Sequence, residues 1–225
     1  MIAAIALGIA FGWLQAAATS DQPRVSATDT SYLSCTTWTG KGWTAPTARS
    51  LRTPLMESPK GFRAYAEVKV LVKGGSCENT TTLYVASGAD RAFRIAYAES
   101  RGGNGIRLIG WSPTADKLLA EVNLWEYETD RGFVHVPLIY DASTGQAKEI
   151  LALDQSLSCH FGPNCEFEFE VEGWKTNEQL LTKISRTPVS EEYEQHFCVT
   201  KPRVFVFDLQ KGTVQADRPD LKKKN

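Results

Sequence analysis

The sequence predicts an all-β fold made of tandem four-stranded antiparallel sheets, and three observations support this. Residues 166–172 (EFEFEVE) alternate strictly, so that two phenylalanines and a valine face one side and four glutamates the other. A plan of turn, short apolar strand, closing strand and turn recurs about every fifty to sixty residues. No stretch after the N-terminal apolar run carries the apolar stripe of an amphipathic helix, and only residues 190–194 suggest a short helical turn.

Length and charge limit the classes of function. The chain has 225 residues, of which 42% are hydrophobic, which is enough for one domain with a full core. Its formal net charge of -1 provides no field that would recruit nucleic acid, so no nucleic-acid partner is predicted. The only basic run lies in residues 216–225, which we expect to be a disordered, solvated tail.

The N-terminus resembles an export signal. Residues 2–14 form an apolar run too short to cross a bilayer comfortably, and three alanines at 16–18 supply the small residues that a signal peptidase requires. Residues 1–18 are therefore predicted to be a signal peptide, and the protein is predicted to be exported to the periplasm or the extracellular space. Because no Lys or Arg precedes the apolar run, an uncleaved membrane anchor remains the alternative.

Five cysteines are expected to meet an oxidising compartment, where thiols tend to pair. Cys159 and Cys165 bracket a Gly-Pro-Asn turn and are predicted to form a local disulfide. Cys77 and Cys198 occupy similar places in two repeats. A second bridge is predicted either between these two or from one of them to Cys35, and the sequence does not decide between these pairings.

Zinc is the alternative to a disulfide near residue 160. Cys159, His160 and Cys165 offer thiolate and imidazole ligands, but a structural zinc site needs four ligands at paired spacings. We therefore predict no metal and no cofactor.

The repeats define the predicted domain. Residues 19–57 are rich in Ser, Thr, Pro and Gly and are expected to form a linker and an irregular segment, in which Trp38 and Trp43 would cover one end of the β-domain. Residues 58–215 contain three units. The units open with the turns SPKG (58–61), WSP (111–113) and WKTN (174–177), and close with the strands and turns LYVASG (83–88), LIYDASTG (138–145) and VFVFDLQKG (204–212).

The second unit carries the clearest motif. Its segment WSPTADKLL (111–119) resembles the Trp-Ser-Pro-Asp-Gly-Lys signature of TolB-like and WD-type β-propeller repeats, and residues 58–61 match it in part. Thr114 and Ala115 replace the usual Asp-Gly pair, and the third unit lacks the Ser-Pro pair. The resemblance implies a β-propeller-like domain of about three blades plus a possible partial fourth, and it implies little about function.

Three blades are fewer than closed propellers have, so the free edges need a cover. Residues 32–57 would add strands to a partial fourth blade, two chains would close a six-bladed ring as a homodimer, or the sheets would fold against each other as a sandwich. Of these the first is favoured.

One cluster stands out as a candidate site. It comprises Trp125, Glu126, Tyr127, Glu128 and Asp130, at the end of a strand beside a turn. Glu126 and Glu128 would share one face of the strand, and paired carboxylates can perform acid–base chemistry on a glycoside. An exposed strand edge is also commonly charged for solubility, with the aromatic residues facing the core, and this interpretation is preferred.

The leading hypothesis is therefore an exported, non-enzymatic binding or scaffold module for a protein or peptide of the cell envelope. The alternative is a carbohydrate-active or other hydrolytic enzyme that uses Glu126 and Glu128. A third possibility is a structural envelope protein held at the membrane by an uncleaved N-terminus. The hydrolase motif Gly-x-Ser-x-Gly is absent from the sequence.

Overall fold

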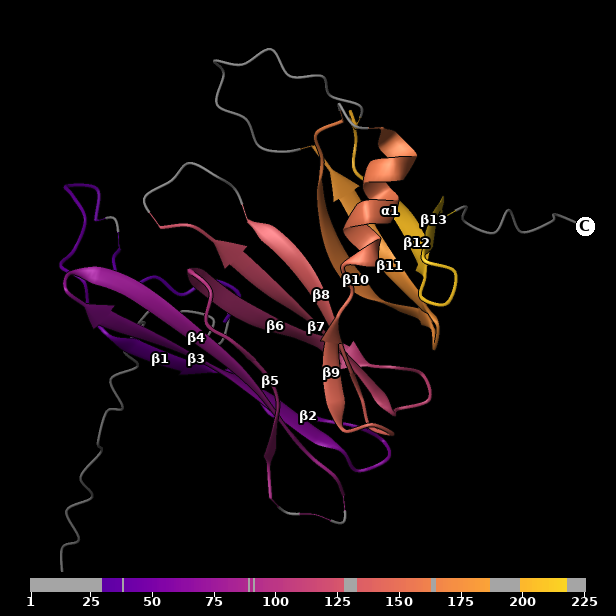
Figure 1. Cartoon of the computed structure of the whole chain (residues 1–225), viewed down its shortest axis with the longest axis horizontal. Coiled ribbons are helices and arrows are strands. Elements are labelled where there is room, and N and C mark those ends of the chain that lie inside the picture. The colour runs from indigo at the N-terminus through magenta and orange to yellow at the C-terminus, as the bar shows by residue number, and fades with distance from the viewer. Residues whose placement is uncertain are drawn as a thin grey trace, which may run out of the picture.

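The computed structural model describes residues 30–37, 39–88, 90, 92–127, 133–162, 165–186 and 199–217. In these residues the chain forms three antiparallel sheets and one helix, which follow one another in chain order across the molecule (Figure 1). The prediction of an all-β fold made of tandem antiparallel sheets is confirmed.

The first sheet has the strand order β1-β3-β4-β5, and β2 also pairs with β3. Its strands are β1 (Arg49–Arg52), β2 (Met56–Glu57), β3 (Arg63–Lys73), β4 (Ser76–Ala86) and β5 (Arg94–Glu99). The predicted linker therefore supplies two strands, both bonded to β3, and the sheet begins before residue 58. Residues 32–57 extend the first sheet and do not start a fourth.

The second and third sheets are simple four-stranded meanders. The second contains β6 (Gly103–Trp111), β7 (Lys117–Trp125), β8 (Val134–Asp141) and β9 (Gln146–Glu149). The third contains β10 (Glu168–Thr176), β11 (Gln179–Ser185), β12 (Arg203–Asp208) and β13 (Thr213–Ala216). The turns between β6 and β7, β8 and β9, β10 and β11, and β12 and β13 coincide with turns predicted from the repeats.

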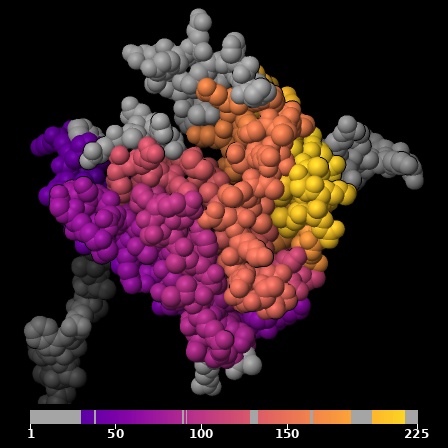
Figure 2. All heavy atoms as spheres, in the orientation of Figure 1, coloured from indigo at the N-terminus to yellow at the C-terminus, as the bar shows by residue number. Residues whose placement is uncertain are grey.

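The second sheet lies between the other two, because its strands are apolar on both faces. Val122 and Leu138 face the first sheet and join one core, whereas Leu119 and Ile139 face the third sheet and join another. Figure 2 shows the same succession at the surface, where the chain passes from indigo to yellow across the molecule. This packing of whole sheets on one another is compatible with propeller blades.

The helix α1 (Ala152–Phe161) was not predicted from the sequence. It buries Leu153 and Leu157, one turn apart, against the core of the third sheet. Polar residues surround this pair, so the apolar stripe is too narrow to recognise, and tertiary packing decides the conformation. The helix cannot cross a membrane, and no other helix in the described part of the chain is long and apolar enough to do so.

The cysteines follow the predicted pairing in one case and depart from it in the other. Cys35 and Cys77 form a disulfide, which was one of the open alternatives, and therefore Cys77 does not pair with Cys198. Cys159 is an exposed free thiol, so the predicted Cys159–Cys165 bridge is wrong. Cys159 lies in α1, a conformation that the turn-based prediction did not foresee, and Cys165 is disulfide-bonded elsewhere. Cys198 lies outside the described residues.

Residues 30–35 form a segment, here called the strap, that runs along β6, an edge strand of the second sheet. The Ile106 N–H donates to the Thr30 carbonyl over 2.9 Å, and the Asn123 side chain donates to the Ser31 carbonyl over 3.2 Å. Gly105 permits this approach, because a Cβ there would lie 2.4 Å from the Ser31 oxygen. The Cys35–Cys77 disulfide then fixes the end of the strap to the first sheet.

Candidate functional site

The aromatic corner is the surface formed by Tyr32, Trp125, Tyr127 and Phe133 where β7 ends and β8 begins. The Trp125 ring lies 4.9 Å from Tyr32, 5.7 Å from Phe133 and 6.2 Å from Tyr127, measured between ring centroids. Trp125 itself is buried, whereas Tyr32 is 50% exposed and Phe133 is 43% exposed. The corner thus presents two half-exposed rings on a buried indole.

The aromatic corner is fixed in place by hydrogen bonds of the Asn79 side chain. The Tyr127 hydroxyl donates to the Asn79 side-chain oxygen over 2.6 Å, and burial raises the pKa of Tyr127. The Asn79 amide donates to the Leu33 and Asn104 carbonyls over 2.9 and 2.7 Å. A buried, nearly saturated polar group of this kind fixes the three chain segments that it joins.

The predicted site is only partly brought together. Trp125 and Tyr127 belong to the corner, Glu126 between them is exposed, and Glu128 and Asp130 lie outside the described residues. Tyr32 and Phe133 were not predicted to contribute. Tyr32 is 93 residues before Trp125 in the chain, and its position depends on the strap, which no local pattern reveals.

Trp43 is 67% exposed, so it is not a buried plug of the domain. Trp38, the other tryptophan of that prediction, lies outside the described residues.

A buried ionic cluster joins the second sheet to the third. The Glu121 side chain is only 1% exposed and accepts hydrogen bonds from Arg107 over 3.1 Å and from the Val171 N–H over 2.9 Å. Arg107 in turn donates to the Val171 carbonyl over 3.1 Å. Burial alone would raise the pKa of Glu121, but His135, the Val171 N–H and Arg107 together lower it below its usual range.

A second ionic cluster joins the first sheet to the second. Arg101 pairs with Glu99 and lies 3.0 Å from Glu149, and the Tyr97 hydroxyl donates to Glu149 over 2.6 Å. Burial would raise the pKa of Glu99, but hydrogen bonds from the Arg101 side chain and from two backbone N–H groups lower it to about 2. In both clusters the most deeply buried carboxylate, Glu121 or Glu99, thus has a pKa below its usual range, because the neighbouring donors outweigh the effect of burial.

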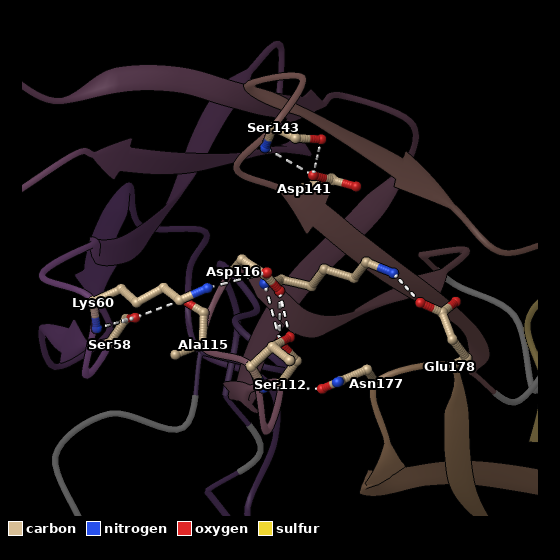
Figure 3. Close-up of polar contacts among 11 residues, drawn as sticks. Ser58, Lys60, Ser112, Ala115, Asp116, Asp141, Ser143, Asn177 and Glu178 are labelled. Atoms are coloured by element: carbon tan, nitrogen blue, oxygen red, sulfur yellow. Dashed lines mark hydrogen bonds and ion pairs between the residues drawn. The ribbon is translucent and has the colours of Figure 1, made fainter.

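The opening turns of the three repeats meet along one rim of the molecule (Figure 3). Ser58 donates to the Ala115 carbonyl over 2.7 Å, and the Thr114 N–H donates to the Asn177 side chain over 2.9 Å. Lys60 forms an ion pair with Asp116, and Lys117 forms one with Glu178. The sequence motif thus supplies polar contacts between neighbouring sheets, and its acidic groups are already occupied by donors of the rim itself.

A shallow pocket of about 430 Å³ lies beside α1, where Cys159 and His160 are among the lining residues. The His160 ring packs against Phe161 and Phe205, at 4.9 and 5.3 Å. In the described residues, no group of three or more His, Cys, Asp or Glu side chains is arranged to hold a metal ion.

Comparisons with known proteins add one distant structural likeness. No family model and no curated protein matches the sequence. Among solved structures, the chain is similar to the Pyrococcus horikoshii acylaminoacyl peptidase, with 14% sequence identity and a TM-score of 0.43. The match covers 77% of this chain but only 26% of the peptidase chain, and at this level it carries no argument about function.

Proposed function

We propose that the protein is an exported, non-enzymatic binding module that docks a protein or peptide at the aromatic corner. The single observation that carries the proposal is the exposure of Tyr32 and Phe133 on the buried Trp125. Half-exposed aromatic rings on a rigid base are typical of the central residues of protein interfaces, because they bury much area at little entropic cost.

Two further features support the proposal. The buried carboxylates at the sheet junctions are paired with arginines, so they act as structural links. The Cys35–Cys77 disulfide supports export, because such bonds persist in oxidising compartments.

The proposal is tested by a pull-down from envelope extract with the wild-type chain and three alanine variants. Tyr32→Ala and Phe133→Ala each remove an exposed ring and are expected to lose the captured partner. Ile95→Ala removes a side chain that is 64% exposed on the first sheet, and it is expected to keep that partner. Retention of the same partner by both ring variants would contradict the proposal.

A further inference from the structure

The strand β1 is an open edge of the first sheet. It pairs with β3 and with no other described strand, and all four of its residues are exposed. The Thr53 N–H, directly after β1, donates to the Ala66 carbonyl of β3 over 2.9 Å. Because N–H groups point to opposite sides at successive strand positions, the main-chain groups of Ser50 and Arg52 point outward from the sheet.

This edge is also positively charged. Arg49 donates to the Thr37 hydroxyl over 3.2 Å, and the Arg52 guanidinium lies 3.4 Å from the centroid of the Tyr65 ring. Neither arginine forms an ion pair within the described residues. Two cations without a carboxylate partner on a four-residue edge favour an acidic segment beside them.

An apolar pocket of about 240 Å³ begins where β1 ends. It is lined by Thr30, Thr53, Pro54, Leu55, Met56, Arg107 and Leu108. Leu55 is 46% exposed, although it lies in the wall of the pocket. The volume is below that of pockets for drug-sized ligands and suits an apolar side chain of a bound peptide.

We infer that β1 binds an extended acidic peptide as an additional strand, with an apolar side chain of that peptide in the adjoining pocket. Main-chain bonds to Ser50 and Arg52 supply affinity, the two arginines select acidic residues, and the pocket selects an apolar anchor. This site shares no residue with the aromatic corner and goes beyond the function proposed above.

The test measures fluorescence anisotropy of a labelled peptide of about ten residues, in which glutamate alternates with valine and each end carries phenylalanine. Ser50→Pro removes the outward N–H without touching a main-chain bond to β3, and proline is tolerated on edge strands. The hydrogen bond that the Ser50 hydroxyl donates to Glu67 of β3 is lost equally in the Ser50→Ala control. Ser50→Pro is expected to weaken binding at least tenfold, whereas the matched Ser50→Ala variant, which keeps the N–H, stays within twofold of wild type.

Two further measurements test the roles of the peptide's negative charge and of the apolar pocket separately from main-chain pairing. A peptide with lysine in place of glutamate is expected to lose binding. Leu55→Ser is expected to weaken binding of the glutamate peptide at least fivefold, and the matched Leu151→Ser variant, at another exposed leucine, is expected to leave it unchanged.

Equal binding by Ser50→Pro and Ser50→Ala, equal binding of the lysine and glutamate peptides, or no binding by wild type overturns the inference. Circular dichroism checks that each variant is folded. Capture at the aromatic corner is expected to be unaffected by Ser50→Pro, so failure of one proposal is distinguishable from failure of the other.

Discussion

Replacing Glu121 with glutamine is predicted to loosen the third sheet from the second. The wild-type carboxylate accepts hydrogen bonds from Arg107 and from the Val171 N–H, and it lies 3.3 Å from the His135 ring nitrogen. Glutamine has nearly the same shape, keeps one oxygen for the Val171 N–H and removes the negative charge. The variant therefore tests the charge and leaves the packing almost unchanged.

The magnitude follows from burial. Removing one partner of a buried ion pair costs about 3–5 kcal/mol, because the other charge is left buried and uncompensated. Here Arg107 is 35% exposed and keeps its pair with Glu170 at 2.8 Å, so part of its charge stays compensated. The retained bond to Val171 preserves roughly 1 kcal/mol. We expect a loss of about 2–3 kcal/mol in the free energy of unfolding.

The assay is urea unfolding, followed by circular dichroism and by tryptophan fluorescence. Trp174 reports on the junction, because its indole N–H donates to the Gly110 carbonyl of the second sheet over 3.0 Å. Glu170→Gln is the matched control: it contacts the same arginine but is 45% exposed, and it is expected to cost less than about 0.5 kcal/mol. A similarly small loss for Glu121→Gln would refute the reasoning.

Three further predictions concern other joints of the fold. Cys35→Ser combined with Cys77→Ser opens a loop closed over a sequence separation of 42, and is expected to lower the free energy of unfolding by about 4 kcal/mol, measured by calorimetry. The pKa of Glu99 is lowered from 4.5 to about 2 in the folded protein, so its stabilisation is complete above about pH 4.5 and is lost as pH falls towards 2. The full pKa shift of Glu99 corresponds to about 3 kcal/mol of stabilisation, which solvent around the exposed Arg101 reduces to roughly 1–2 kcal/mol. In acid unfolding measurements, the Glu99→Gln variant is expected to lack this pH-dependent loss of stability. Ser58→Ala removes a buried hydrogen bond to the second sheet and is expected to cost about 1–2 kcal/mol, with no loss if the rim contact contributes nothing.

The parts of the fold that the sequence predicted are those set by local periodicity. Period-two alternation is a property of each strand, and the turns that join strands have their own chemistry, so residues 166–172 and the turn after Tyr140 were recognisable. The helix α1 was not, because only Leu153 and Leu157 mark its buried face. Its conformation depends on the core of the third sheet, which forms from residues on both sides of it.

The candidate site was predictable only where one strand carries it. Trp125 is the last residue of β7 and Tyr127 lies two positions later, so their proximity was visible in the sequence. Tyr32 reaches the corner through the strap, and the strap depends on Asn79, Gly105 and Asn123, which lie on three different strands. Glu121 did offer a signal, because a single acid in the apolar strand LLAEVNLW is expensive to bury unless it has a partner.

The structure also shows how main-chain groups on the edge strands β6 and β10 find hydrogen-bond partners. On β6, the main-chain groups of Ile106 are taken by Thr30 of the strap, through its carbonyl and its hydroxyl. On β10, the N–H and the carbonyl of Val171 are taken by the side chains of Glu121 and Arg107 from the second sheet. Side chains and the strap therefore do at these edges what a neighbouring strand does inside a sheet. By the same reasoning β1 differs from β6 and β10 within the described residues, because no hydrogen bond takes up its outward main-chain groups, and that difference makes Ser50→Pro a direct test of whether the edge has a ligand.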